Sequence, residues 1–198
     1  MSFIGGYYIV PVEKERINIV LGKRGKTKRI LEENFNVRIT VDKDRGEVKI
    51  ESIPGKTTPL QLLKAREAII ALVSGASMEQ VLRLADEDTY MTIINLKQYT
   101  SGERKDIERV AGRIIGEKGK AKKMIKELTG ADIIVHGHNV IIIGKQEQLE
   151  MARTAVIMLI QGRQHKTVYR YLQRKKRELK YRKLKTFLTH TYEEEFKI

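Results

Sequence analysis

The stretch Ile19-Val20-Leu21-Gly22-Lys23-Arg24-Gly25-Lys26 decides the fold, because it occurs twice in the chain. Its second copy is Arg113-Ile114-Ile115-Gly116-Glu117-Lys118-Gly119-Lys120, 94 positions later. The register continues downstream, where Ile39 matches Ile133. A constant offset across a turn and the strand after it indicates an internal repeat. The sequence therefore predicts two copies of one structural unit.

Each copy is predicted to contain a strand, a helix, a Gly-x-x-Gly turn, a second helix, two strands and a closing helix. Apolar residues three or four apart after Gly25 and Gly119 indicate short amphipathic helices, which end near Asn34 to Asn36 and at Gly130. Alternating apolar residues around two turn signals indicate hairpins, the second with the tighter turn. The expected ranges are 7–12 and 91–96 for the opening strands, 42–46 and 137–139 for the hairpin turns, and 60–73 and 149–160 for the closing helices.

Composition narrows the class of protein. The chain has 198 residues, of which 41% are hydrophobic and 32% charged, enough for a buried core and a charged surface. It contains no Cys, which excludes a disulfide scaffold and a thiolate zinc site. No apolar run is long enough to span a membrane, and the short apolar segment 3–12 lacks the basic residues that precede a signal sequence. We therefore expect a cytoplasmic protein.

The charge is concentrated near the C-terminus. The formal net charge is +14, and residues 163–185 contain eleven Lys or Arg against one acid, Glu178. This density favours a polyanionic partner; a solvated helix face is the alternative. We predict a basic helix over 166–188 that packs only at its start, through a thin apolar seam of Val168, Leu172 and Leu179, and a frayed end over 189–198. The expected domains are 1–86 with an extra short helix from Met78, 87–163, and the tail 164–198.

Each Gly-x-x-Gly turn has the chemistry of an anion-binding site. Glycines let the backbone approach a phosphate closely, and the turn opens a helix whose first N–H groups point outward. Cations surround both turns: Lys23, Arg24, Lys26, Lys28 and Arg29 at the first, and Arg113, Lys118, Lys120, Lys122 and Lys123 at the second. Glu117 departs from this pattern, since a carboxylate repels phosphate, although an acid is favoured at a helix start. The sequence leaves open which turn is the better site.

These elements in this order resemble the type I KH domain, present twice. The run 91–179 further resembles the KH-domain factor of small-subunit rRNA maturation, the partner of the PIN-domain endonuclease that trims the 3′ end of that RNA. The residues that carry this resemblance are Arg113 to Lys120, Met151-Ala-Arg-Thr-Ala-Val156, Leu159-Ile-Gln-Gly162, Val168-Tyr169 and Leu172. It implies an α+β fold of two βααββα domains, each a three-stranded sheet packed by helices, plus a basic C-terminal helix.

The resemblance also implies a function. It is that of a non-enzymatic assembly factor that binds single-stranded RNA and holds the 3′ region of small-subunit pre-rRNA for endonucleolytic maturation. Further implied partners are ribosomal proteins and the alpha subunit of translation initiation factor two. The implied RNA contacts are both turns with their cations, including Gly22, Gly25, Gly116, Glu117 and Gly119. Groove walls are implied at Val20, Leu21 and Ile30, and at Ile114, Ile115, Met124 and Ile134; plain core is the alternative for these apolar residues.

Other functions have weaker support. Gly25-Lys26-Thr27 imitates the end of a Walker A loop, but Val20 stands where that motif needs glycine. His136 and His138 flank a tight turn without an acidic cluster, so we expect neither a metal nor a cofactor, and no nucleophile–base set can be assembled. An RNA-feeding subunit of an exosome-like nuclease remains the alternative function. A membrane-surface helix needs a stronger apolar face than the tail supplies.

Overall fold

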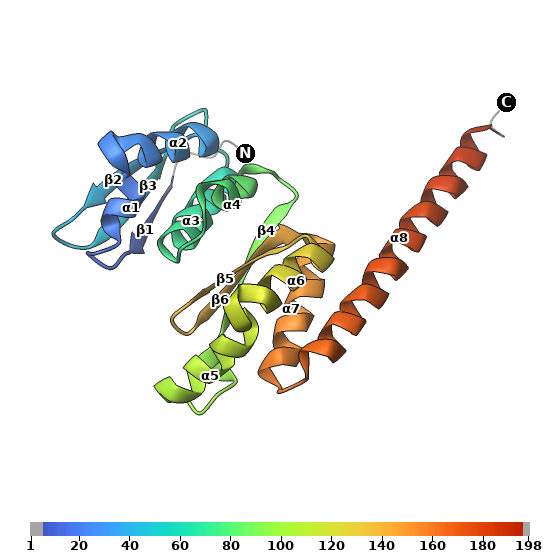
Figure 1. Ribbon diagram of the computed structural model, residues 1–198. Helices are drawn as coiled ribbons and strands as arrows, with labels where there is room; N and C mark the ends of the chain where they lie inside the picture. The colour runs from blue at the N-terminus through green and yellow to red at the C-terminus, as the bar shows by residue number, and fades with distance from the viewer. Residues whose placement is uncertain (1–5, 196–198) are drawn as a thin grey trace. The chain divides into compact units, whose positions relative to one another are not determined.

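The computed structural model describes residues 6–195, apart from the side chains of residue 183 and of residues 186–195 (Figure 1). Its helices and strands form two compact units. The first contains the described residues up to Asn95 together with Asp132–Gln146, and the second contains Leu96–Ala131 and the described residues from Glu147 onward. Each unit is treated by itself below.

Two antiparallel three-stranded sheets belong to the first unit. One has the order β1-β3-β2 and the other the order β4-β6-β5. Both predicted hairpins are confirmed: Val41 pairs with Val48 across a four-residue turn, and Val135 pairs with Val140 across the tighter turn Gly137-His138. The strands are β1 (Tyr7–Pro11), β2 (Val37–Asp42), β3 (Glu47–Ser52), β4 (Thr89–Asn95), β5 (Asp132–His136) and β6 (Asn139–Lys145).

The helices complete the predicted order in both copies, so the α+β fold with two βααββα repeats is confirmed. Thr58 and Ser77 start α3 and α4 as capping boxes with Gln61 and Gln80. The helices are α1 (Ile17–Leu21), α2 (Lys26–Phe35), α3 (Pro59–Val73), α4 (Met78–Leu82), α5 (Arg104–Ile115), α6 (Lys120–Thr129), α7 (Gln146–Ile160) and α8 (His165–Glu195). Short 3₁₀ turns are η1 (Lys23–Gly25), η2 (Arg83–Ala85), η3 (Leu96–Gln98) and η4 (Glu117–Gly119).

The core of the first unit follows from the strand alternation. Val10, Val48 and Ile50 point into the core and are at most 5% exposed, while Tyr7 and Ile9 point outward. Helices α2 and α3 pack on this sheet, as Figure 1 shows. The same hydrophobic cluster continues through α4 and η2 to three isoleucines of the second sheet: its members there include Val81, Leu84, Ile134, Ile141 and Ile143.

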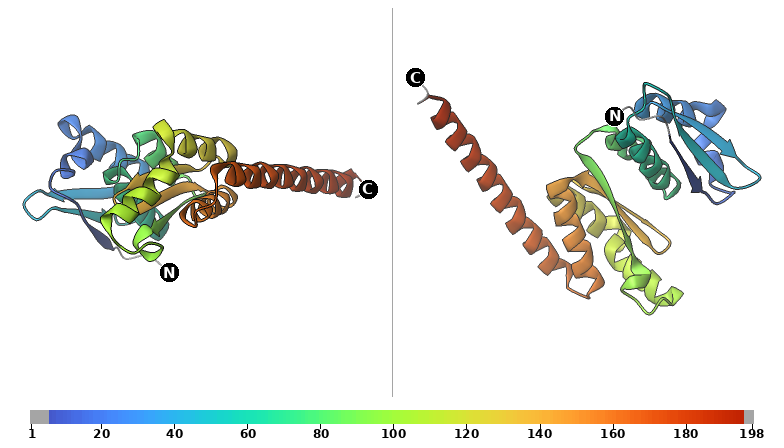
Figure 2. Two further views of the ribbon diagram at one scale, coloured as in Figure 1. Left: turned by 60° about the horizontal axis from the view of Figure 1, so that its bottom comes forward. Right: turned by 180° about the vertical axis from the view of Figure 1, so that it is seen from behind.

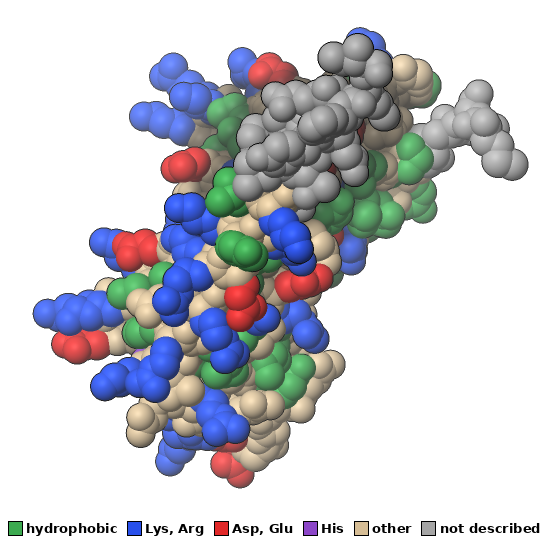
Figure 3. Space-filling model, turned by 90° about the vertical axis from the view of Figure 1, so that its right-hand side faces the viewer, with side chains coloured by type: hydrophobic (Ala, Val, Ile, Leu, Met, Phe, Trp, Pro, Cys, Tyr) green, Lys and Arg blue, Asp and Glu red, His purple; other side chains and the backbone are tan. Residues whose placement is uncertain are grey.

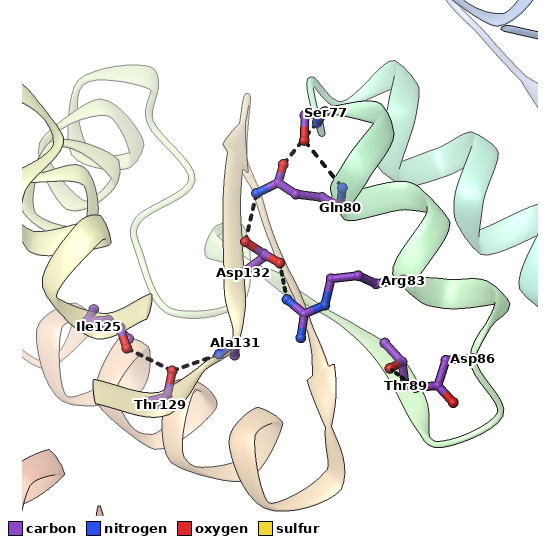
Figure 4. Close-up of polar contacts among 9 residues, drawn as sticks. All are labelled: Ser77, Gln80, Arg83, Asp86, Thr89, Ile125, Thr129, Ala131 and Asp132. Carbon is purple, nitrogen blue, oxygen red and sulfur yellow. Dashed lines mark hydrogen bonds and ion pairs between the residues drawn. The ribbon is translucent and has the colours of Figure 1, made fainter. Parts of the chain in front are cut away.

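A buried carboxylate joins the second sheet to α4 and η2. Asp132, at the start of β5, is 1% exposed; its Oδ1 accepts a hydrogen bond of 2.9 Å from Gln80 Nε2, and its Oδ2 is ion-paired with the Arg83 guanidinium (Figure 4). The segment before β4 is held as well. Lys64 Nζ donates to the carbonyl oxygens of Asp86, Glu87 and Thr89. The acidic segment 86–88 is therefore held in place by a buried lysine.

In the second unit, α6 packs against α5 and α8. Val168 and Leu172 of α8 are fully buried, as the apolar seam predicts. The expectation that the tail packs only at its start is wrong, because α8 makes contacts as far as Arg182. Lys176 Nζ donates to the Glu127 carbonyl at 3.1 Å, and Arg182 is paired with Glu147 at 2.6 Å.

Helix α8 is one continuous helix through Glu195, visible in both views of Figure 2. Of the end expected to fray, residues 196–198 lie outside the described residues. Over the described part of the chain, no helix combines the length and the apolar character that crossing a membrane requires.

Candidate nucleic-acid interface

The two Gly-x-x-Gly turns have the same backbone. Gly22, Arg24 and Gly25 have φ angles of 68°, 54° and 75°, and the matching Gly116, Lys118 and Gly119 have 73°, 50° and 79°. All six lie in the left-handed region, which glycine adopts without cost and other residues adopt rarely. The second copy of the sequence therefore reproduces an unusual local conformation, and not only a pattern of residue types.

The two glycines of each turn serve different purposes. We call Gly22 and Gly116 the inner glycines, and Gly25 and Gly119 the outer glycines. A Cβ on Gly22 would lie 2.6 Å from Thr27 Cβ and 2.8 Å from Thr27 N, and a Cβ on Gly116 would meet Ala121 at the same two distances. The inner glycine is thus needed for close packing of the turn on the following helix. A Cβ on Gly25 or Gly119 would meet nothing within 4 Å. The space in front of the outer glycine is open to a ligand.

Each turn leads directly into a ten-residue helix whose N-terminus is uncapped. The first N–H group of each helix, that of Lys26 or Lys120, donates to the carbonyl oxygen of Lys23 or Glu117. Gly25 and Gly119 are the N-cap residues of α2 and α6 and have no side chain that could accept from the N–H groups that follow. These N–H groups, together with the helix dipole, favour an anion at this position. Anion binding at the two turns stays a prediction, and the start of each helix supplies the dipole and N–H groups that it requires.

At the first turn, the cations surround a hollow of about 630 Å³. Exposed side chains from η1 and α2 form its rim: it is lined by Lys23, Arg24, Lys26, Arg29, Ile30 and Glu33. Lys28 is turned aside, because its Nζ lies 3.6 Å from Glu32 Oε1. That oxygen also accepts a hydrogen bond of 2.7 Å from Ile39 N, so Glu32 links α2 to β2.

At the second turn, acids partly compensate the cations. Lys120 Nζ lies 4.0 Å from Glu117 Oε2, and Lys123 Nζ lies 4.0 Å from Glu127 Oε1. The side chain of Glu117 is 77% exposed, so solvent screens both its attraction to Lys120 and its repulsion of a phosphate. Lys118 is exposed and Lys122 is half-buried. The second turn has the lower local charge of the two.

Arg113 has a structural position that the sequence did not reveal. Its Nη2 donates to the Arg163 carbonyl at 3.0 Å, and its own carbonyl is bonded to His165 Nε2 at 2.8 Å. Its Nε is buried and has no hydrogen-bond partner among the described residues. Arg113 therefore holds the α7–α8 connection, which lies 50 positions away in the sequence. These contacts give it a structural role that a phosphate contact does not require.

The candidate groove walls divide into two groups. Val20 and Ile114 are fully buried and Ile134 is 3% exposed, so these three pack in the core. Ile115 and Met124 are each 37% exposed, and Leu21 and Ile30 are half-buried. Only this second group is available to bases next to the turns.

No metal site competes with this interpretation in the part of the chain that the structure describes. No group of three His, Cys, Asp or Glu side chains lies close enough there to hold an ion. His136 is the last residue of β5 and pairs with Asn139, and His138 lies in the tight turn between them.

Comparisons with known proteins identify the family. Residues 90–177 match the eukaryotic type KH-domain (KH-domain type I). The chain is 33% identical to KH domain-containing protein MJ0443 of Methanocaldococcus jannaschii over 87% of this chain and 75% of that protein. It is 40% identical to a chain in the crystal structure of the a/eIF2alpha-aDim2p-rRNA complex from Pyrococcus horikoshii, with a TM-score of 0.81. This match covers 89% of this chain and 97% of that one.

The chain belongs to the Dim2p family of KH-domain proteins. Its eukaryotic relatives are more distant. The pre-rRNA-processing protein PNO1 of Eremothecium gossypii is 27% identical over 81% of this chain and 61% of its own length. The chain thus spans less than two thirds of that relative, and the resemblance to a KH-domain maturation factor stated from the sequence is confirmed at the level of the family.

Proposed function

We propose that this member of the Dim2p family binds single-stranded RNA at its two Gly-x-x-Gly turns and acts as an assembly factor of the small ribosomal subunit. In this role it holds the 3′ region of the pre-rRNA for endonucleolytic maturation. The observation that carries the proposal is the duplicated turn, with its left-handed backbone, uncapped helix and exposed cations. The names of the relatives support it, since PNO1 is named for pre-rRNA processing and aDim2p was crystallised with rRNA.

Binding at a turn uses two kinds of contact. The N–H groups at the start of the helix that no side chain caps hold backbone phosphates together with the nearby cations, while bases lie on the accessible apolar residues beside the turn. Leu21 and Ile30 serve this purpose at the first turn, and Ile115 and Met124 at the second. The proposed phosphate-side residues are Gly22, Lys23, Arg24, Gly25, Lys26 and Arg29, with Gly116, Glu117, Lys118, Gly119, Lys120, Lys122 and Lys123.

The protein is proposed to position RNA without cutting it. The cleavage is then the work of a partner, the PIN-domain endonuclease. Further proposed partners are ribosomal proteins and the alpha subunit of translation initiation factor two; the latter is supported by the a/eIF2alpha in the P. horikoshii complex. This function requires no cofactor. We propose that the protein acts in the cytoplasm.

Binding to the 3′-terminal fragment of the small-subunit rRNA precursor tests the function, against a shuffled RNA of equal length across a salt series. Preference for the true fragment that persists at high salt, and that falls in Lys23→Asp/Arg24→Asp or in Lys118→Asp, is the expected result. Replacing Gly22 or Gly116 is unsuitable here, because a Cβ at either site collides with the next helix. Equal binding of both RNAs, or wild-type affinity in both variants, contradicts the proposal.

A further inference from the structure

Three arginines form a row on the outward face of α8. Arg170, Arg174 and Arg177 are spaced four and three positions apart, so they fall within an arc of about 60° on a helix of 3.6 residues per turn. The row lies opposite the buried seam of Val168 and Leu172. We call these three residues the arginine stripe. All three are exposed, and the space-filling view of the side that carries α8 shows Lys and Arg spread widely over that face (Figure 3).

Among the described residues, few acids compensate the charge of the stripe, and the same holds for Lys166 and Lys180 of α8. Lys176 and Arg182 are engaged by Glu127 and Glu147 within the fold. Within the described residues, Arg170 and Arg177 have no acidic partner. Arg174 Nε lies 3.6 Å from Glu178, whose other oxygen is taken by Lys175 at 2.7 Å. Most of the stripe's charge is therefore uncompensated.

The surface at the stripe is concave. A hollow of about 490 Å³ is lined by the stripe together with Met158, Thr167 and Tyr171. The hollow thus offers guanidinium groups beside a hydroxyl, a thioether and an aromatic ring. About one helical turn after Arg177, on the same face of α8, the side chain of Tyr181 is 72% exposed. A row of cations next to exposed aromatic rings is the arrangement by which proteins bind a single strand, with phosphates on the cations and bases on the rings.

We propose that the arginine stripe binds the sugar–phosphate backbone of single-stranded RNA as a second site, separate from the Gly-x-x-Gly turns. Arginine suits phosphate better than lysine does, because its planar fork forms two parallel hydrogen bonds and also stacks on bases. The stripe consists of arginine alone, and Lys166 and Lys185 continue nearly the same face of α8 beyond its two ends. From Arg170 to Arg177 the helix rises about 10 Å, enough to span neighbouring phosphates of an extended strand.

This inference rests on the proposed RNA-binding function, and the test separates the two. The full chain is titrated with labelled oligouridine across a potassium chloride series. The stripe variant is Arg170→Gln/Arg174→Gln/Arg177→Gln. Its matched control is Lys56→Gln/Lys105→Gln/Arg153→Gln, which removes the same charge from exposed positions away from the stripe. A third variant replaces the stripe by three lysines, and helical content is compared by circular dichroism.

The stripe variant is expected to bind about tenfold or more weakly, with the slope of log K against log salt reduced by about 2, because each phosphate contact on a single strand contributes about 0.7. The control should lose less than threefold, and the lysine variant should fall between the two. Equal losses in stripe and control variants overturn the proposal, since they leave only diffuse charge. Wild-type RNA binding by the stripe variant also overturns it and directs attention to an acidic protein partner. Loss of binding in the turn variants alone leaves the proposed function intact and removes the stripe.

Discussion

The first and the second Gly-x-x-Gly turn share a backbone and differ in side chains. Their φ angles agree within 5°, yet the positions between the glycines are Lys23 and Arg24 in one turn and Glu117 and Lys118 in the other. The backbone is fixed by packing of the inner glycine on the next helix, whereas the exposed side chains are under no packing constraint. The two copies can therefore keep one shape while their affinities for an anion diverge.

The largest effect is expected where the copies agree. Gly22→Ala and Gly116→Ala should each lower the free energy of unfolding by about 3 kcal/mol or more, since the added Cβ meets backbone atoms of the next helix. Gly25→Ala and Gly119→Ala are matched controls: their Cβ points into open space, so they bear only the left-handed φ, about 1–2 kcal/mol. Urea unfolding measures all four. Equal losses at inner and outer glycines would show that the close approach is not what fixes the turn.

A second large effect is expected where the copies diverge inside the fold. With the offset of the repeat, the position of Asp132 corresponds to Arg38, an exposed residue of β2. Asp132→Ala leaves the Arg83 guanidinium next to an apolar site and should cost about 3 kcal/mol. Arg38→Ala should cost within about 0.5 kcal/mol, as surface changes do. Thermal or urea unfolding checks both; a loss below 1 kcal/mol for Asp132→Ala would mean that Arg83 reaches solvent without penalty.

The closing helices of the two copies also differ at a buried position. When α3 and α7 are aligned at their first residues, Lys64 corresponds to Met151, and both are buried. Lys64→Met places the apolar residue of one copy in the other, but it strips the carbonyl groups of Asp86, Glu87 and Thr89 of their donor. We expect a loss of about 2 kcal/mol in urea unfolding at neutral pH. Unchanged stability would show that water replaces the ammonium group at no cost.

The same variant tests a pH effect. Burial lowers the pKa of Lys64 below its ordinary value. Between the lowered pKa and the ordinary one, the unfolded chain holds more protons than the folded chain, so the free energy of unfolding rises with pH in that alkaline window. Lys64→Met should lack this contribution. Subtracting the two stability curves isolates it, and parallel curves would rule out a shifted lysine.

The features that occur in both copies of the repeat could be predicted from the sequence. The contacts between segments far apart in the sequence could not. The order of elements, the two turns and the ends of α2 and α6 follow from local patterns, and the structure contains them. Arg113 and Lys64 were not predictable in their actual roles, because their partners lie 50 and more than 20 positions away and share no periodicity with them. Val20 and Ile114 illustrate a different limit. A period of 3.6 marks an apolar face, but it does not separate core from groove wall.

Reversing charge at the turns compares their use by RNA. Lys23→Asp/Arg24→Asp should weaken binding of the precursor fragment by about tenfold or more, since it replaces two positive charges by two negative ones at the phosphate site. Aspartate also tolerates the left-handed φ of Arg24, so the turn should keep its shape. Lys118→Asp should have the smaller effect. Lys43→Asp/Lys56→Asp is the control of equal charge on exposed loops. A larger loss at Lys118 would make the second turn the main site despite Glu117.

The smallest effect concerns Glu117, the one acid between the glycines. Glu117→Lys gives the second turn two cations between its glycines, as in the first. It should raise RNA affinity by about threefold at low salt, because solvent screens the interaction of an exposed charge with a phosphate. Glu117→Gln should give roughly half of that gain in free energy. Both gains should disappear near 1 M salt, where the Debye length is about 3 Å. If neither variant changes the affinity at low salt, no phosphate lies at the second turn. The repeat has then kept its backbone there for packing alone, and the first turn carries the binding.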